Sequence, residues 1–177
     1  MALDGSILLW IQENMRCGFL SAILIPYTYS GNYAIPWLAL ILVLLFFKKT
    51  RRAAIFALVA LILGIVLNDV IIKHIICRPR PFETILELIP IVKKPTSFSC
   101  PSGHSATAFA TALTLFLCTK KWIGIPALFF AAVMAFSRMY VGVHYPSDVI
   151  LGIAVGCASA VLVLVLGKRI FKKRKAD

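Results

Sequence analysis

The strongest constraint on this chain is a series of apolar segments that would be stable only when buried in a lipid bilayer. A transmembrane α-helix needs about 20 mainly apolar residues, and six segments approach or reach that length with few charges. These segments are residues 17–29, 33–47, 53–76, 103–119, 122–140 and 146–167. Hydrophobic residues make up 60% of the sequence and charged residues 15%, a balance that excludes an ordinary soluble domain. The sequence therefore predicts an all-α, polytopic membrane protein built as a six-transmembrane-helix bundle.

The whole chain, residues 1–177, is predicted to form a single membrane-embedded domain, because no repeat or low-complexity linker divides it. Residues 1–16 mix apolar and polar side chains and are predicted to form either an interfacial helix or the solvated start of the first span. The first apolar run is preceded by Asp4 and has no lysine or arginine ahead of it. No cleavable signal peptide is therefore expected. The cysteines are scattered and fit small buried side chains. A disulfide between Cys77 and Cys100 stays open, since both flank one polar loop.

The basic residues in the turns predict the orientation of the bundle. Six spans would place both termini on one side, together with the turns after the second and fourth spans. Most of the 19 lysines and arginines fall on that side, at Arg16 and within 48–52, 120–121 and 168–175. By the positive-inside rule this side is cytoplasmic, so the N- and C-termini are predicted in the cytoplasm of a plasma-membrane protein. The net charge of +12 then reflects topology, and no nucleic-acid partner is expected.

Three polar clusters interrupt the apolar sequence, and the predicted topology brings all three to the extracytoplasmic face. They comprise Lys73 and Arg80 at the end of the third span, Ser102, Gly103 and His104 at the start of the fourth, and Arg138, His144 and Asp148 between the fifth and the sixth. Ionisable groups in or near a bilayer are costly, so they mark functional sites by default. The convergence of the three clusters predicts one active site at the outer membrane–water boundary.

Each cluster also has an ordinary structural interpretation. Asp69 and Lys73 have the i, i+4 spacing of a helical ion pair, and Ser102 is a natural helix N-cap. Arg78 fits an interface residue whose charged head reaches water. His74 points about a quarter-turn away from Lys73 on the helix, so a structural role is predicted for it rather than a catalytic one.

The residue types of the combined clusters suit a tetrahedral oxyanion. Lysine and arginine supply positive charge, and a helix that begins near Gly103 would direct free N–H groups at an anion. Asp148, in the first turn of a helix that begins near Pro146, would orient His144 and stabilise its charged form. His144 then suits attack on phosphorus, and His104 suits protonation of the leaving group. The sequence therefore predicts phosphoryl transfer through an enzyme intermediate.

A metal site is another use for two histidines and an aspartate. The nearby cations would repel a divalent ion and already supply its positive charge, so neither a metal nor another cofactor is expected. Two other phosphatase chemistries are excluded. No cysteine is followed by an arginine at the spacing of a cysteine-dependent phosphatase loop, and no Walker-type glycine loop is present.

These residues resemble the motifs of the type-2 phosphatidic acid phosphatases, integral-membrane relatives of vanadium haloperoxidases and bacterial acid phosphatases. The matching positions, in the family's order and spacing, are Lys73, Arg80-Pro81, Pro101-Ser102-Gly103-His104, Ser137-Arg138, His144 and Asp148. The resemblance implies a metal-independent histidine phosphatase in which His144 becomes phosphorylated, Asp148 supports it and His104 protonates the leaving group. It also implies that the phosphate is bound by Lys73, Arg80, Ser102, Gly103 and Arg138.

A site at the membrane surface suits a lipid whose phosphate lies at headgroup depth. Members of the resembled family cleave several such lipids, and the expected substrate here is an isoprenyl diphosphate such as undecaprenyl diphosphate. Phosphatidylglycerol phosphate and phosphatidate are the alternatives. A lipid-phosphate translocase would use the cationic pocket only for binding, but two histidines with a supporting aspartate exceed what binding needs. Substrate and membrane lipids are the only partners predicted, and the sequence does not predict an oligomeric state.

Overall fold

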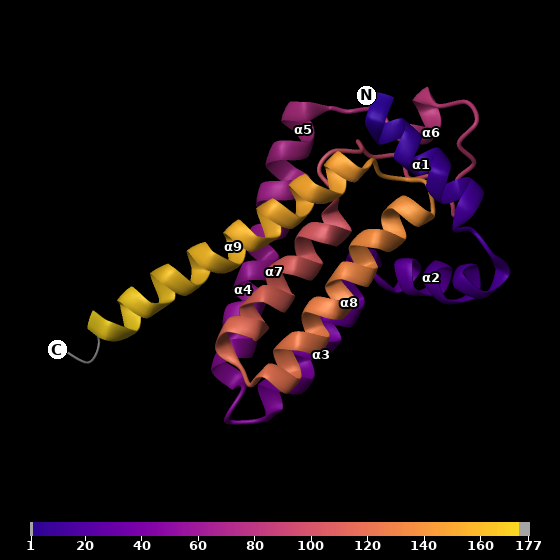
Figure 1. The fold of residues 1–177 in the computed structure, drawn as a ribbon. Coiled ribbons are helices and arrows are strands. Elements are labelled where there is room, and N and C mark those ends of the chain that lie inside the picture. The colour runs from indigo at the N-terminus through magenta and orange to yellow at the C-terminus, as the bar shows by residue number, and fades with distance from the viewer. Residues whose placement is uncertain (1, 174–177) are drawn as a thin grey trace.

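The computed structural model describes residues 2–173, with side chains described for residues 3–167. Every regular element in this range is helical, which confirms the all-α class. The elements are α1 (Ala2–Asn14), α2 (Gly18–Ser30), η1 (Asn32–Ala34), α3 (Ile35–Phe46), α4 (Arg51–Ile65), the π-helix η2 (Val66–Ile72), α5 (Lys73–Ile76), α6 (Pro81–Thr84), α7 (Gly103–Cys118), α8 (Lys121–Tyr140) and α9 (Pro146–Lys173). Figure 1 shows α3, α4, α7, α8 and α9 as an elongated bundle.

Helix α7 is the centre of the bundle and packs against α4, α8 and α9. Its buried face consists largely of alanines, among them Ala106, Ala108 and Ala110. Small side chains let helix backbones approach closely, and close packing drives helix association in a membrane. The approach of α9 is so tight that a Cβ on Gly156 would clash with the Ala106 carbonyl oxygen. The first turn of α7 is therefore held firmly among its neighbours.

The predicted count of six spans is not confirmed. Three helical stretches are long and apolar enough to cross a membrane, and a fourth is reached if α2 and η1–α3 are counted as one bent span. These two parts meet at 70°, because Tyr33 and Ala34 adopt positive φ angles of 56° and 57° and break the helix. Each part alone has at most 15 residues, which at 1.5 Å per residue falls short of a hydrocarbon core of about 30 Å.

This bend changes the position of the N-terminus. In Figure 1 α2 lies across the bundle and only α3 runs along it, so α1 lies at the end that also carries α5 and α6, whereas α9 runs to the opposite end. Arg16, predicted on the side of the C-terminus, instead donates to the backbone oxygens of Tyr140 at 3.0 Å and Ile89 at 2.6 Å. A helix does form in the predicted N-terminal segment, but its place at a membrane interface stays a prediction.

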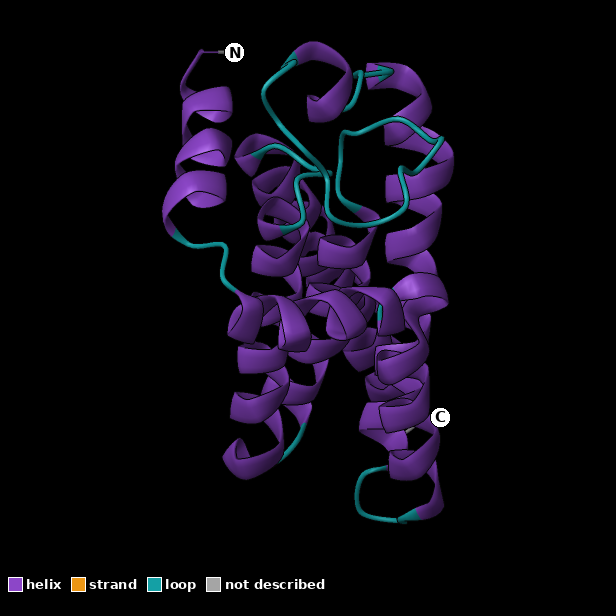
Figure 2. Cartoon of the chain, turned by 90° about the vertical axis from the view of Figure 1, so that its right-hand side faces the viewer, coloured by secondary structure: helices purple, strands orange, loops and turns teal. Residues whose placement is uncertain are grey.

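The long connections gather at the same end of the bundle as α1 and α6 (Figure 2). Two contacts fix the start of α7 to its neighbours there. Asn68, fully buried in η2, donates from Nδ2 to the Pro101 carbonyl at 3.3 Å, and the Ser102 amide donates to the Asp148 carbonyl at 3.0 Å. Elements far apart in the sequence are thereby joined around the three polar clusters.

Gly152 is predicted to be essential for this junction. A Cβ at this position would lie 2.5 Å from the Ser102 carbonyl oxygen, so Gly152→Ala should push α9 away from the start of α7. We expect a loss of about 1–3 kcal/mol of stability, the usual cost of overpacking, measured by thermal unfolding in detergent. Gly18→Ala is the matched control, because a Cβ there has no neighbour within 4 Å. Equal stability of the two variants would contradict this tight packing.

Candidate active site

A cavity of about 560 Å³ lies where the three polar clusters meet. Six of the eight residues predicted for the site line it, namely Lys73, Arg80, Gly103, His104, Arg138 and His144. The other two, Ser102 and Asp148, are fully buried behind the wall of the cavity. The convergence predicted from the topology is therefore present in the structure, although the first two predicted spans are not confirmed.

His144 stands in the short connection between α8 and α9, directly before Pro146 begins α9, and is 2% exposed. Its Nε2 lies 3.2 Å from Nη1 of Arg80. A guanidinium can only donate, so Nε2 accepts and carries a lone pair, which leaves the proton of a neutral ring on Nδ1. Nδ1 lies 3.7 Å from Oδ2 of Asp148 and has no hydrogen-bond partner. The contact is beyond hydrogen-bond length, so Asp148 acts on the ring through its charge.

The charge state of His144 suits a role as nucleophile. Burial, together with the positive charges of Arg80 and Arg138, lowers the pKa of His144 to about 3, although Asp148 opposes the change. The imidazole is therefore neutral at physiological pH. A neutral imidazole with its Nε2 lone pair near the cavity can attack an electrophile, and the nearby carboxylate can stabilise the positive charge that develops.

Asp148 is held by three donors at the start of α9. The Ser99 hydroxyl and the Tyr145 amide donate to Oδ2 at 2.5 and 2.9 Å, and Nη1 of Arg78 donates to Oδ1 at 2.7 Å. A carboxylate buried with this many hydrogen bonds is fixed in position and in its charged form. The negative charge beside His144 is thus a rigid feature of the site.

The cavity wall carries two buried arginines that form no ion pair within the part of the chain that the structure describes. Arg80, 3% exposed, donates to the backbone oxygen of Ser97 at 2.8 Å and that of Val143 at 2.9 Å. Arg138, 5% exposed, donates to the Thr28 hydroxyl at 2.5 Å, and its Nε has no partner. A buried charge is costly unless it is compensated. The two guanidinium groups therefore leave a place for an anion of two or more negative charges.

Lys73 lies at the junction of η2 and α5 and is 7% exposed. It forms the predicted ion pair with Asp69, which also lines the cavity. The Asp69 carboxylate stands against the start of α7, where a Cβ on Gly103 would lie 2.7 Å from Oδ1. A larger residue there would have to displace the Asp69 carboxylate, and the first turn of α7 directs free N–H groups toward this region. An anion bound at the helix start would repel Asp69 and compete with it for Lys73.

His104, in the first turn of α7, faces the cavity from the side of η1. Its Nε2 lies 3.2 Å from the side-chain oxygen of Asn32. The ring packs against Gly31, where a Cβ would lie 2.6 Å from its Cδ2. His104, on α7, and His144, in the connection between α8 and α9, therefore border one cavity, as an acid and a nucleophile acting on one phosphoryl group would.

Ser102 is the N-cap of α7. Its hydroxyl accepts from the Ser105 hydroxyl at 2.9 Å and from the Ser105 amide at 3.4 Å. Because the side chain is fully buried, the structure supports the capping role. Contact between Ser102 and phosphate stays a prediction. His74 does not line the cavity; its ring packs edge-on against Phe98. Cys77 and Cys100 are both free thiols in the structure.

Arg78 has a role that the sequence did not indicate. Instead of reaching into water at an interface, it bridges Asp148 at 2.7 Å and Asp4 of α1 at 2.9 Å, and its guanidinium lies 3.8 Å from the centre of the Tyr145 ring. Asp4 in turn accepts from the Ser147 hydroxyl at 2.5 Å. Burial opposes ionisation of Asp4, but the hydrogen bonds from Ser147 and Arg78 outweigh it and lower its pKa. Helix α1 is thus tied to the carboxylate beside His144.

Replacing Arg78 with glutamine should slow catalysis without removing a group that lines the cavity. Loss of a hydrogen bond between charged groups costs about 1.5–3 kcal/mol, so we expect kcat to fall by roughly ten- to a hundredfold as Asp148 loses its fixed position. Asp4→Asn is the control, because it loosens α1 but leaves the contact between Arg78 and Asp148; its kcat should change far less. An Asp4→Asn defect as large as that of Arg78→Gln would show that the tether to α1 matters rather than Asp148.

Three of the contacting residues could not have been found from the sequence. Thr28 and Asn32 reach the site only because the chain bends between α2 and α3, and Ser99 lies in an irregular loop without a motif. Each is a common polar residue whose role depends on long-range packing.

Comparison with known proteins places this site in a family. The pattern of the PAP2 superfamily matches residues 52–172. The undecaprenyl-diphosphatase of Sulfolobus acidocaldarius is 38% identical over 128 residues, which are 72% of this chain and 61% of that protein. Undecaprenyl-diphosphatase BcrC of Bacillus subtilis is 32% identical over 80% of this chain and 69% of its own length. This chain thus spans about three fifths to two thirds of the length of these relatives.

A solved structure shows the same fold over nearly the whole chain. The transmembrane PAP2-type phosphatidylglycerolphosphate phosphatase of Bacillus subtilis superposes with a TM-score of 0.77 at 28% sequence identity, covering 96% of this chain and 86% of that one. The family match contains every residue predicted for the site, from Lys73 to Asp148. On this evidence the chain belongs to the PAP2 superfamily.

Proposed function

We propose that the protein is a membrane phosphatase that removes the terminal phosphate of an isoprenyl diphosphate, such as undecaprenyl diphosphate. The observation that carries the proposal is the neutral, buried His144 at a cavity that it shares with two buried arginines, neither of which forms an ion pair with a described residue. Such a cavity needs an anion, and it offers that anion a nucleophile. The names of the two undecaprenyl-diphosphatases favour a diphosphate of a polyisoprenol over the other lipid phosphates.

In the proposed first step, Nε2 of His144 attacks the terminal phosphorus, and the bond to the bridging oxygen breaks. Arg80, Arg138 and Lys73 neutralise the charge on the equatorial oxygens, which is the main demand of phosphoryl transfer. His104, protonated from water when the phosphate dianion lies beside it, gives its proton to the departing oxygen, so the lipid leaves as its monophosphate. Asp148 stabilises the positive charge that the phosphorylated imidazole carries.

The second step regenerates the enzyme. A water molecule gives a proton to the now neutral His104 and attacks phosphorus, which breaks the P–N bond and releases inorganic phosphate. The electron pair of that bond returns to Nε2, so His144 is again a neutral imidazole. No metal or other cofactor is required in this scheme, because the fixed cations supply the electrostatic stabilisation that a metal would give.

The proposed orientation places the cavity on the extracytoplasmic face. The turns at the opposite end of the bundle carry Lys48, Lys49, Lys120 and Lys121, and basic turns favour the cytoplasm. The C-terminal end of α9 would then be cytoplasmic, whereas α1 would lie outside with the site. An impermeant amine reagent should label the exposed Lys93 in right-side-out vesicles; labelling confined to inverted vesicles would reverse this orientation.

One assay compares the candidate activities directly. The purified protein is mixed in detergent and EDTA with an isoprenyl diphosphate, phosphatidylglycerol phosphate or phosphatidate at equal surface concentration, and released phosphate is measured. We expect the highest kcat/KM for the isoprenyl diphosphate. If phosphatidylglycerol phosphate gives the highest kcat/KM instead, the proposed substrate is wrong and this lipid, named for the solved relative, takes its place. Binding of these lipids without any release would instead favour a translocase.

The low pKa of His144 predicts how phosphoenzyme formation responds to pH. The imidazole is unprotonated above about pH 3, so its reactive fraction should stay constant as the pH falls from 8 to 5. For a histidine with an ordinary pKa near 6.5, the unprotonated fraction would fall roughly thirtyfold at pH 5. The first-turnover burst with an aryl phosphate, corrected for ionisation of the substrate, measures this step. A decline that follows a pKa of 6–7 would show that His144 is charged in the free enzyme.

A further inference from the structure

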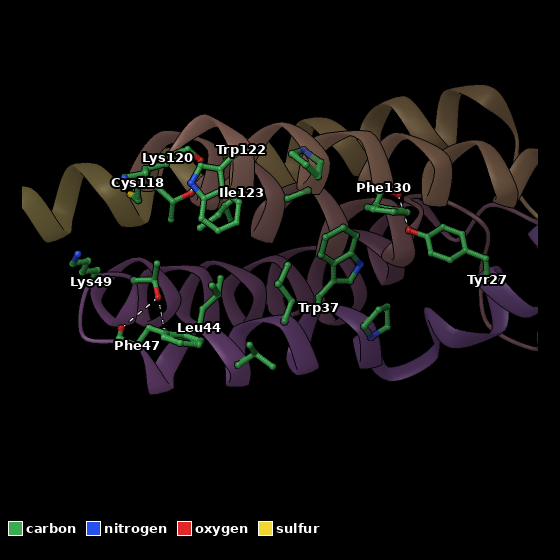
Figure 3. Close-up of a pocket in the computed structure, with 17 residues that line it drawn as sticks. Tyr27, Trp37, Leu44, Phe47, Lys49, Cys118, Lys120, Trp122, Ile123 and Phe130 are labelled. Atoms are coloured by element: carbon green, nitrogen blue, oxygen red, sulfur yellow. Dashed lines mark hydrogen bonds between the residues drawn. The ribbon is translucent and has the colours of Figure 1, made fainter.

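A second and larger cavity lies between α3 and α8, away from the candidate active site. It has a volume of about 960 Å³, at the upper end of the range of roughly 300–1,000 Å³ typical of ligand pockets. The residues that line it, which do not overlap with those of the active-site cavity, include Trp37, Leu40 and Leu44 on α3 and Ile123 and Ala127 on α8. Figure 3 shows Trp37 and Leu44 of α3 and Ile123 of α8 facing one another across a long gap between the two helices.

The two ends of this α3–α8 groove differ in chemistry. At one end, the Tyr27 hydroxyl donates to the Phe130 carbonyl at 2.8 Å and links α2 to α8 (Figure 3). At the other end, Lys49 and Lys120 line the groove beside Trp122, and all three side chains are exposed. The groove is therefore apolar along its length, crossed by a polar link near the active site and cationic at its far end.

Among the described residues, no carboxylate forms an ion pair with Lys49 or Lys120. Lys48, Arg51 and Lys121 lie in the same two turns or begin the helices that follow them. The carboxylates among residues 3–167 lie elsewhere, at Asp4, Glu13, Asp69, Glu83, Glu87 and Asp148. An uncompensated set of cations at a membrane surface attracts anionic headgroups, by about 1 kcal/mol for each basic side chain.

The length of the groove fits one leaflet. Lys120 and Phe130 are ten residues apart on and just before α8, a distance of about 15 Å at the helical rise of 1.5 Å per residue. This is half of a hydrocarbon core of about 30 Å. A lipid with its headgroup at Lys49 and Lys120 would thus extend one acyl chain to the level of Tyr27, where the link to Phe130 stops it.

We propose that the α3–α8 groove binds an anionic phospholipid of the leaflet at the end of the bundle opposite the active site, with its phosphate held between Lys49 and Lys120 and one acyl chain lying between α3 and α8. The hydrocarbon tail of the substrate is the rival occupant. Its diphosphate would sit at His144, beyond the Tyr27–Phe130 link, and it would bring no negative charge to the two lysines. The bound phospholipid fills the gap between α3 and α8 and fixes the far end of the bundle.

Quenching of tryptophan fluorescence by brominated lipid tests this site. The full-length protein in neutral detergent carries Trp10→Phe, so that Trp37 and Trp122, which both line the groove, give the signal. Phosphatidylglycerol and phosphatidylcholine with the same brominated chains are the probes. We expect half-maximal quenching at a several-fold lower mole fraction of phosphatidylglycerol.

A pair of double variants distinguishes the groove from general surface charge. Lys49→Gln/Lys120→Gln should weaken phosphatidylglycerol binding by roughly tenfold or more and abolish its advantage over phosphatidylcholine. Lys48→Gln/Lys121→Gln removes the same charge from the same turns but not from the groove lining, and should change binding less than threefold. Phosphate release close to that of the parent protein would show that both variants are folded.

Three results would overturn the proposal. Equal losses in the two double variants would mean diffuse attraction to the surface rather than a site. Equal quenching by the two brominated lipids in the parent protein would mean that the groove takes any acyl chain. Recovery of fluorescence on addition of an isoprenyl diphosphate, in the presence of brominated phosphatidylglycerol, would mean that the substrate tail occupies the groove.

Discussion

Replacement of His144 by alanine is expected to abolish phosphate release, with kcat falling by at least roughly 10⁴-fold, as is usual when a nucleophile that forms a covalent intermediate is removed. No other described group that lines the cavity can take its place as a neutral nucleophile with a comparable setting, because Lys73 is paired with Asp69 and His104 contacts Asn32. Release of inorganic phosphate from the preferred lipid, in detergent with EDTA, measures the effect.

His74→Ala is the matched control for this experiment. It removes the same side chain from α5, where the ring packs against Phe98 outside the cavity, and kcat should stay within about threefold of the parent value, since surface changes cost little stability. Tryptophan fluorescence and thermal unfolding of both variants would show that they are folded. Activity of folded His144→Ala above one hundredth of the parent value would exclude His144 as the nucleophile.

Replacement of His104 by asparagine should separate the two steps of the reaction. General acid–base catalysis contributes typically 10²–10⁴-fold, and the need for it depends on the leaving group. A nitrophenyl phosphate releases a stable anion without a proton, so the variant should still give a burst of nitrophenol equal to the amount of enzyme. Steady-state turnover after the burst should fall by roughly 10²-fold or more, because no base activates the water.

An alkyl monophosphate gives the complementary result, since its leaving oxygen needs the proton. With this substrate the variant should show neither a burst nor turnover. Asn32→Ala is the control, because it removes the partner of His104 at 3.2 Å but keeps the imidazole; its burst should be seen with both substrates. Equal losses of burst with aryl and alkyl phosphates in His104→Asn would exclude a general acid at this position.

Most of the site could be predicted from the sequence because the residues that the chemistry needs are also the residues that are costly to bury in an apolar chain. Buried arginine and histidine are expensive in an apolar chain, so Arg80, Arg138 and His144 could be assigned to a site before any fold was known. Helix ends also have local signals, and Ser102 and Pro146 do begin α7 and α9 as expected. These inferences needed only residue type and spacing.

The course of the chain through the membrane could not be predicted in the same way. The apolar runs at 17–29 and 33–47 are each typical of a helix, but composition does not reveal the angle between two helices. The bend depends on positive φ angles at Tyr33 and Ala34, which are uncommon for residues other than glycine, and neither residue type predicts them. The bend also leaves Arg16 beside Tyr140 and Ile89 rather than on the side of the C-terminus as predicted, because adding or removing one span moves the adjoining segment to the opposite side of the membrane.

The contacts around Asp148 could not be predicted from the sequence either. Arg78 and Asp4 are 74 positions apart, and neither belongs to a local pattern that predicts an ion pair. Their meeting depends on how α1 lies across the end of the bundle, which results from the bend between α2 and α3. The carboxylate beside His144 was predictable, but the groups that hold it were not.

The most direct measurement is the position of phosphate on the enzyme during turnover. His104→Asn, mixed with the nitrophenyl phosphate and quenched at alkaline pH, would be digested and its peptides mapped by mass spectrometry. The mechanism predicts one phosphoryl group per molecule, on His144, and none in His144→Ala. Phosphate on a different residue, or continued turnover with no phosphorylated peptide, would contradict it.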